Sequence, residues 1–130
     1  WLYDENKTNE RFAAAYDRDT VRSKFWNNGE VKTIFDRTIH ADHSHALNYI
    51  VQSTTADLVL RQVIKVNEAM EGLESFIAFI IHDSIVLDMK ESERHKIPEL
   101  LKIFSDTDLG KFLVNVRAGF NFGEMKEINL

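Results

Sequence analysis

The clearest pattern of apolar and polar positions lies between Phe76 and Met89, where the sequence reads FIAFIIHDSIVLDM. Two runs of β-branched and aromatic residues flank a short polar turn, His82-Asp83-Ser84. Such runs around so short a break predict a β-hairpin. The hairpin would hold the Asp83 carboxylate at the edge of an apolar sheet. A rigid scaffold of this kind suits a metal-binding acid, because it limits how far the side chain can move.

Asp83 also has an ordinary structural explanation. Aspartate is common in turns because its side chain accepts hydrogen bonds from nearby backbone N–H groups and tolerates unusual dihedral angles. A partly buried histidine such as His82 often does no more than satisfy hydrogen bonds. From the hairpin alone the structural explanation is the simpler one, so a functional role depends on the neighbouring segments.

The N-terminal part of the chain predicts one helix and one strand. Apolar residues recur at helical spacing from Asn9 to Trp26, and Asn27-Asn28-Gly29 is a strong stop signal. Glu30 to Phe35 then alternates as a short strand, with Val31 and Ile34 as its expected anchors.

A long helix is predicted in the middle of the chain. Asp42 or Ser44 would cap its start, and it would run to about Glu71 and end at Gly72. Its middle part, LNYIVQSTTADLVLRQVIKV, is apolar on most faces and has small residues from Ser53 to Ala56. We therefore expect a central helix that lets another backbone approach closely.

The C-terminal part predicts a further helix and a last strand. The helix would run from Ser92 to about Phe104, with Pro98 either kinking it or shifting its start. Asp106 to Gly110 breaks it, and Phe112 to Ala118 alternates as a strand. The resulting order, α-β-α-β-β-α-β, predicts the α+β fold class.

Composition limits the possible functions. The chain has 130 residues, enough for one domain with a modest core. It contains no cysteine, which excludes disulfides and thiolate metal sites. The formal net charge of −5 counts against a free-standing nucleic-acid binder, since such proteins usually carry net positive charge. No apolar run approaches the ~20 residues that span a bilayer, and the polar start lacks an export signal, which favours an intracellular protein without membrane contact.

Polar residues interrupt the apolar pattern of the long helix. Asn48, Gln52 and Thr55 are spaced i, i+4 and i+7, so they share one helix face. A polar stripe on a buried helix needs partners. The stripe would either line a groove or form hydrogen bonds with neighbouring strands.

Three motifs follow one another along the chain. Gly29 to Arg37 reads GEVKTIFDR, Ala46 to Asp57 reads ALNYIVQSTTAD, and Ile81 to Ser84 reads IHDS. They resemble, in the same order, the G-x-V-x-T-x-x-G-R strand, the A-x-N-x-x-x-Q-G-T-A-A-D helix and the V-H-D-E hairpin in the palm of family A DNA polymerases. The closing FLVNVRAGFNFG also resembles that family's last palm strand, so the resemblance covers about residues 10 to 123.

The resemblance implies roles for the matching positions. Asp83 matches one of two aspartates that bind the catalytic Mg²⁺ ions, which activate the primer 3′-hydroxyl and neutralise charge on the leaving pyrophosphate. His82 matches a residue near the primer terminus, and Arg37 matches the arginine of the strand motif, a nucleic-acid-binding position. Asn48 and Gln52 match residues that face the primer–template minor groove. Acceptors there are nearly the same for every base pair, so amide donors can check pairing geometry.

The chain also departs from the family pattern. Ser84 replaces a charged glutamate, Ser53 replaces a glycine of the helix motif, and Asp36 replaces the glycine before the arginine. Two motifs are missing: the D-Y-S-Q-x-E-x-R strand with the other metal-binding aspartate, and the R-x-x-x-K-x-x-x-x-x-x-Y-G fingers helix that grips the nucleotide. Both would lie before residue 1. The resemblance therefore implies that residues 1–130 form a single C-terminal palm subdomain of a partial polymerase.

The function expected from the resemblance is template-directed nucleotidyl transfer by a two-metal mechanism. The partners would be primer–template DNA, a dNTP and a second polypeptide or missing segment that supplies the fingers and the other aspartate. The location would be the host cytoplasm if the protein is viral. A non-catalytic palm-like assembly module is the alternative, favoured by Ser84 and the acidic charge. A metal-dependent nuclease that uses Asp83 and a histidine cluster is a third possibility.

The histidine cluster consists of His40, His43 and His45, in the pattern H-x-x-H-x-H. Zinc favours such ligands, but on a helix His45 would point away from the other two and nothing completes a tetrahedral site. Arg61 and Lys65, spaced i, i+4, are interpreted as a solvated face or as contacts to a missing partner chain.

Overall fold

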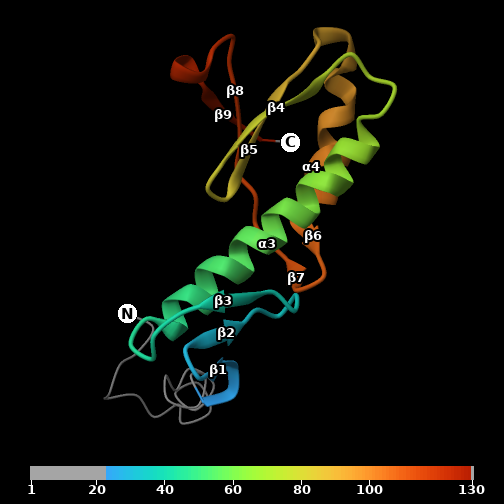
Figure 1. Cartoon of the computed structure of the whole chain (residues 1–130). Helices are drawn as coiled ribbons and strands as arrows, with labels where there is room; N and C mark the ends of the chain where they lie inside the picture. The colour runs from blue at the N-terminus through green and yellow to red at the C-terminus, as the bar shows by residue number, and fades with distance from the viewer. Residues whose placement is uncertain (1–22, 130) are drawn as a thin grey trace, which may run out of the picture. The chain divides into compact units, whose positions relative to one another are not determined.

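The computed structural model describes residues 23–129 (Figure 1), and these fall into two compact units that divide between Asp57 and Leu58. Most of the helix predicted from Asn9 to Trp26 lies outside the described residues. Residues 23–25 are helical, but Trp26 already belongs to a strand. The predicted C-terminal end of that helix is therefore wrong.

The first unit contains a three-stranded antiparallel sheet in the order β1 (Trp26–Asn27), β2 (Glu30–Lys32), β3 (Thr38–His40). Asn28 and Gly29 form the two-residue turn between β1 and β2, with φ angles of 47° and 83°. An Asn-Gly pair favours this kind of hairpin turn because both positions need positive φ. The helical residues 23–25 do end just before this stop signal, but Asn28 and Gly29 themselves join two strands instead of ending a helix.

The core of the first unit forms around Val31 of β2, which is almost completely buried. Its buried neighbours are Ala41, Ala46 and Ile50, and Phe25, Trp26 and Ile39 pack against them. The other predicted anchor, Ile34, is 55% exposed, so that prediction is wrong. The reason is that β2 ends at Lys32 and the chain then turns, with the Thr33 N–H donating to the Arg37 carbonyl at 2.9 Å.

The long helix predicted from Asp42 or Ser44 to Glu71 is present as α3 (Ala46–Ala69), with its start later and its end earlier. The Asp42 carboxylate accepts the backbone N–H of His45 at 2.9 Å, which closes the turn immediately before the helix. The buried positions along α3 are Ala46, Ile50, Val59, Gln62 and Val66.

The second unit contains the predicted hairpin, formed by β4 (Phe76–Ile81) and β5 (Ser84–Asp88). Its turn has two residues, His82 and Asp83, and His82 adopts a φ of 52°. Ser84, placed in the turn by the sequence pattern, is instead the first residue of β5 and pairs across to β4. This register places Asp83 at the tip of the hairpin.

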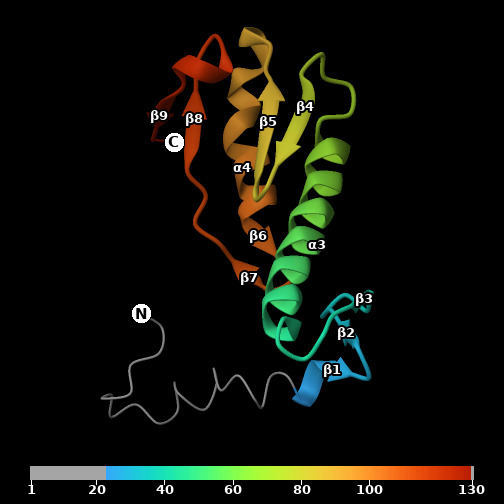
Figure 2. The same ribbon diagram turned by 60° about the vertical axis from the view of Figure 1, so that its left-hand side comes forward.

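The hairpin packs on the core of the second unit. The buried residues of this core are Val66, Met70 and Leu100, and the hairpin contributes Ile77, Ile85 and Leu87. Leu100 lies on α4 (Ile97–Ser105), which runs beside the hairpin in Figure 2. Pro98 lies in the first turn of α4, where its missing N–H costs nothing, and the preceding residues Glu91–Lys96 form the 3₁₀ helix η1. Of the two predicted effects of Pro98, the shifted helix start is the one observed.

The chain after α4 forms two small hairpins. β6 (Asp106–Thr107) pairs with β7 (Gly110–Lys111), and β8 (Val116–Ala118) pairs with β9 (Lys126–Ile128). The prediction of a continuous strand from Phe112 to Ala118 is wrong, because the chain after β7 leaves the strand conformation before β8 begins. The Phe112 N–H still donates to the Ser105 carbonyl at 2.9 Å, but residues 113–115 pair with no strand in the described part of the chain.

The predicted α+β class is confirmed. The described residues form one three-stranded and three two-stranded antiparallel sheets rather than one larger sheet packed against long helices. The palm-like architecture and the single subdomain over residues 1–130 stay predictions. Within residues 23–129, no helix is long and apolar enough to cross a membrane.

Candidate nucleic-acid and metal site

Asp83 lies at the tip of the β4–β5 hairpin with its side chain exposed. The Ser84 hydroxyl donates to its Oδ1 at a distance of 3.4 Å, which is a weak contact. A solvated carboxylate fits one position in the oxygen shell that Mg²⁺ prefers. In the described part of the chain, no group of three or more His, Cys, Asp or Glu residues could hold a metal ion. Asp83 therefore has the chemistry of a single ligand.

His82 is exposed and adopts the left-handed backbone conformation next to Asp83. A two-residue hairpin turn requires this conformation at its first position, where Asn or Gly is favoured. Histidine, like Asn and Asp, is enriched at positive φ, so His82 fits this position of the turn.

Asn48, Gln52 and Thr55 lie exposed on one face of α3. The apolar pattern around these residues suggested a buried stripe, but the stripe is exposed. Thr55 Oγ1 donates to the Val51 carbonyl of its own helix at 2.9 Å. Neither the Asn48 nor the Gln52 side-chain amide forms a hydrogen bond with any residue that the structure describes. The sequence left two alternatives for this stripe, lining a groove or bonding to neighbouring strands. Hydrogen bonds to strands are not observed among the described residues, and both amides are open to a ligand.

Arg37 is held by an aspartate of α3. Its Nε lies 2.9 Å from Oδ1 and 3.1 Å from Oδ2 of Asp57, and its Nη2 lies 2.8 Å from Oδ1. The Arg37 side chain is 49% exposed and that of Asp57 only 14%. Thr33 Oγ1 also donates to Asp57 Oδ2, at 3.2 Å. The sequence patterns included Thr33 and Asp57 in two motifs but gave neither a role, and only the fold shows that they meet.

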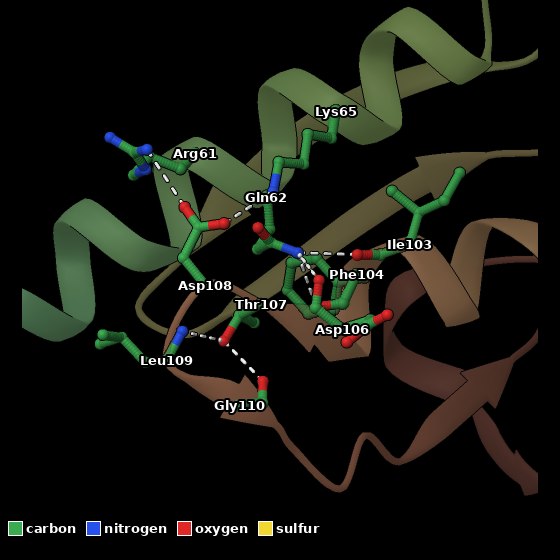
Figure 3. Close-up of polar contacts among 10 residues, drawn as sticks. All are labelled: Arg61, Gln62, Lys65, Ile103, Phe104, Asp106, Thr107, Asp108, Leu109 and Gly110. Carbon is green, nitrogen blue, oxygen red and sulfur yellow. Dashed lines mark hydrogen bonds and ion pairs between the residues drawn. The ribbon is translucent and has the colours of Figure 1, made fainter.

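Arg61 and Lys65 are bound within the second unit. Arg61 Nη2 lies 3.1 Å and Lys65 Nζ 3.5 Å from the carboxylate of Asp108, in the turn between β6 and β7 (Figure 3). The hydrogen bond from Arg61, followed by the charge of Lys65, lowers the pKa of Asp108. Both side chains are about half exposed, at 51% and 43%, which agrees with the predicted solvated face, and each cation also has an acidic partner in the same unit.

Gln62, between those two cations on α3, is buried. Its Nε2 donates to the carbonyls of Ile103 at 2.7 Å and Asp106 at 2.9 Å, at the C-terminal end of α4 (Figure 3). Ile103 lies in the last turn of α4, where carbonyls lack intrahelical partners, and Asp106 is the first residue of β6, so the amide satisfies one acceptor from each element. Gln62 thus fixes where α4 ends against α3 and where β6 begins.

The three histidines of the H-x-x-H-x-H pattern each have a different neighbour. His45 Nδ1 lies 2.7 Å from Asp42 Oδ1, the His43 ring packs edge-on against Trp26, and His40 Nδ1 lies 3.8 Å from the Glu30 carboxylate. Hydrogen bonds from Ser44 and from His45 lower the pKa of Asp42 to about 2. No zinc site forms from these residues in the described structure.

The comparisons with known proteins agree with the motifs. DNA polymerase family A matches residues 9–125. The chain is 28% identical over 116 residues to a DNA polymerase of Mycobacterium phage L5, a match that covers 83% of this chain and 19% of that polymerase. No solved structure matches significantly. The chain belongs to DNA polymerase family A, as the resemblance predicted, and spans about a fifth of the length of its phage relative.

Proposed function

We propose that this chain is the C-terminal palm part of a template-directed DNA polymerase. The observation that supports this most strongly is the exposed Asp83 at the tip of a two-residue hairpin turn, in a chain of DNA polymerase family A. Primer–template DNA and a dNTP are the proposed substrates. Such an enzyme would work where its template is, which is the host cytoplasm if it is viral.

Asp83 is proposed as one catalytic metal ligand. It would share Mg²⁺ with carboxylates from outside the described residues, and the bound ion would supply positive charge at the reacting phosphate. The hairpin holds Asp83 in place, because the core-facing Ile85 and Leu87 of β5 pack against the cluster around Leu100. His82, beside it in the turn, is proposed to lie at the primer terminus.

Asn48, Gln52 and Arg37 are proposed to contact the primer–template duplex. The amides of Asn48 and Gln52 have no partner in the described structure and stand one helical turn apart on α3. Such amides can donate to the acceptors that all base pairs share in the minor groove. This would let the enzyme test base-pair geometry at every position without reading sequence.

A second polypeptide or further segment is proposed to complete the enzyme. Apolar residues of α3 support this in each unit: Val51 is 58% exposed in the first, and Leu60 and Ile64 are 51% and 59% exposed in the second. Exposed apolar residues on a helix indicate surfaces that other protein covers. We expect the purified 130-residue chain alone to lack primer extension, and extension by it would contradict a shared site.

The alternative is a palm-like module without catalysis. It is favoured by Ser84, which stands where the family has a glutamate, so that the hairpin tip has one acid fewer. In that case the exposed hairpin and α3 surfaces would serve assembly only, and Asp83 would be an ordinary turn residue.

The substitution Asp83→Asn in the assembled polymerase distinguishes a catalytic palm part from a module without catalysis. The amide keeps the shape but loses the charge, so we expect primer extension to fall about a thousandfold or more while primer–template binding is retained. Asp88→Asn, at the other end of β5, is the matched control and should stay close to wild type. Near-normal extension by Asp83→Asn, or a defect in stability alone, would refute the catalytic proposal.

A further inference from the structure

The open end of the β4–β5 hairpin is held together by one buried side chain, that of Ser75. Ser75 immediately precedes β4 and is 3% exposed. Its hydroxyl accepts the backbone N–H of Lys90, which follows β5, at 2.9 Å. The last pair of the strand ladder at this end is Phe76 with Asp88. The Ser75 hydroxyl therefore joins the two chain segments just beyond the point where the ladder ends.

The carboxylate of Glu93, in the 3₁₀ helix η1, binds the start of β4. Its Oε1 accepts the Glu74 N–H at 3.0 Å. Its Oε2 accepts the Ser75 N–H at 2.9 Å and also the Ser75 hydroxyl. Hydrogen bonds to an ionised carboxylate are stronger than those between neutral groups. Ser75 and Glu93, which we call the hairpin clamp, thus tie both strands of the hairpin to the segment that leads into α4.

Apolar packing alone does not fix the tilt of this hairpin. Ile77, Ile85 and Leu87 face the core of the second unit, but hydrophobic contact is not directional. The register of the strands shifts between Ile77 and Phe79, and an irregularity of this kind bends a strand. Beyond it, the residues 79–81 are between 38% and 43% exposed. The direction of the outer half of the hairpin therefore depends on how its base is held.

The clamp lies far from Asp83, so a small rotation at the base becomes a large movement at the tip. A strand rises about 3.3 Å per residue, which places Asp83 roughly 20 Å from Ser75 along the hairpin. At that length, a tilt of about 3° moves the tip by about 1 Å. A displacement of about 1 Å in a positioned group can cost about a hundredfold in rate.

We propose that Ser75 and Glu93 are positioning residues that set the tilt of the β4–β5 hairpin and thereby place the Asp83 carboxylate at the metal site. This rests on the proposed polymerase function. Neither residue touches substrate or metal, and both act through Asp83. They belong to none of the three sequence motifs, and only the fold shows that they meet.

The test uses the active polymerase assembly with Glu93→Gln and with Ser75→Ala. Glutamine keeps the size of glutamate but accepts through one oxygen only, so its amide group faces one of the N–H donors. Alanine removes the hydroxyl that accepts the Lys90 N–H. We expect single-turnover nucleotide addition at saturating dNTP to slow about tenfold or more in each variant. The Mg²⁺ concentration that gives half the maximal rate should rise several-fold, while primer–template affinity stays unchanged.

Three variants serve as controls. Glu91→Gln and Ser92→Ala make the same chemical changes at exposed positions of η1, outside the clamp. Ile103→Val removes one methyl group from a residue of α4 that packs against the same core, so it lowers stability without touching the clamp. Each variant is assayed at a temperature at which thermal unfolding shows it to be folded. All three controls should keep the rate and the Mg²⁺ requirement near wild type.

Asp83→Asn separates positioning from a general loss of structure. If the clamp acts through the Asp83 carboxylate, Glu93→Gln should slow the residual extension of Asp83→Asn no further, because residues that act as a unit have non-additive effects. For the same reason, Ser75→Ala combined with Glu93→Gln should be no slower than the slower single variant. A merely structural role would slow both backgrounds by the same factor.

The possible failures can be told apart. The positioning proposal is wrong, while the polymerase proposal stands, if Glu93→Gln behaves like Glu91→Gln or if Ile103→Val slows addition as much as Glu93→Gln does. It is equally wrong if Glu93→Gln slows Asp83→Asn by the same factor as it slows the wild type. If Asp83→Asn leaves extension intact in the same assembly, the polymerase proposal fails first.

Discussion

Replacing Gln62 with methionine should destabilise the second unit through two hydrogen bonds. The Gln62 side chain is 2% exposed, and its Nε2 is the donor for the carbonyls of Ile103 and Asp106. Methionine has nearly the same length and shape but no N–H. The substitution therefore removes the donors without leaving a large cavity.

The expected loss follows from the groups left without partners. A buried acceptor that loses its hydrogen bond costs about 1–3 kcal/mol, and two carbonyls are affected. Gln62 Oε1 is itself buried without a partner in the structure, so removing it returns part of that cost, about 1 kcal/mol. We expect a net loss of about 1–5 kcal/mol in the free energy of unfolding.

Urea unfolding of the chain measures this loss. Gln52→Met is the matched control, because Gln52 lies exposed on the same helix, and it should change the free energy of unfolding by less than about 0.5 kcal/mol. Hydrogen exchange should show the earliest loss of protection in β6 and β7, next to the unsatisfied carbonyls. If Gln62→Met is as neutral as Gln52→Met, the carbonyls do not depend on this amide and the reasoning is refuted.

Three further predictions concern the second unit. In Gly119→Ala, the added Cβ would lie 2.7 Å from the Glu124 carbonyl oxygen, so we expect β8 and β9 to separate, and NMR spectra with intact β8–β9 contacts would contradict this. His82→Asn should stabilise the hairpin by a few tenths to about 1 kcal/mol, because asparagine suits the positive φ, and a lower thermal midpoint would speak against that strain. Hydrogen bonds from Ser75 lower the pKa of Glu93 below its ordinary value of 4.5. Glu93 therefore stabilises the fold fully above about pH 4.5, and this contribution disappears as the pH falls through its lower folded pKa. Glu93→Gln should flatten the pH dependence of stability there, and an unchanged acid profile would argue against this role.

The sequence by itself determined the features that depend on neighbouring residues. Two β-branched and aromatic runs around a short polar break are a local pattern, so the β4–β5 hairpin with Asp83 in its turn was predictable, although Ser84 proved to belong to β5. The effect of Pro98 on the start of α4 is local too, since it follows from one missing N–H and a fixed φ. The family was recognisable because three motifs occur in the right order, although each motif alone is weak evidence.

The tertiary structure decided what depends on partners far along the chain. The strand predicted from Phe112 to Ala118 failed because alternation cannot show which strand, if any, lies alongside. Asn28-Gly29 was misassigned because the same residues suit a helix end and a hairpin turn, and only pairing with β2 selects the turn.

The candidate site shows the same division between local and distant effects. Sequence patterns found Arg37, Asn48, Gln52 and Asp83 as residues, but not what surrounds them. Asp57 is 20 positions from Arg37, and the Ile103 carbonyl is 41 positions from Gln62. Such polar contacts form because burial forces each donor to find an acceptor, and the fold determines which acceptor is within reach. The chemical groups are therefore set by the sequence, while their orientation and charge state are set by the tertiary structure.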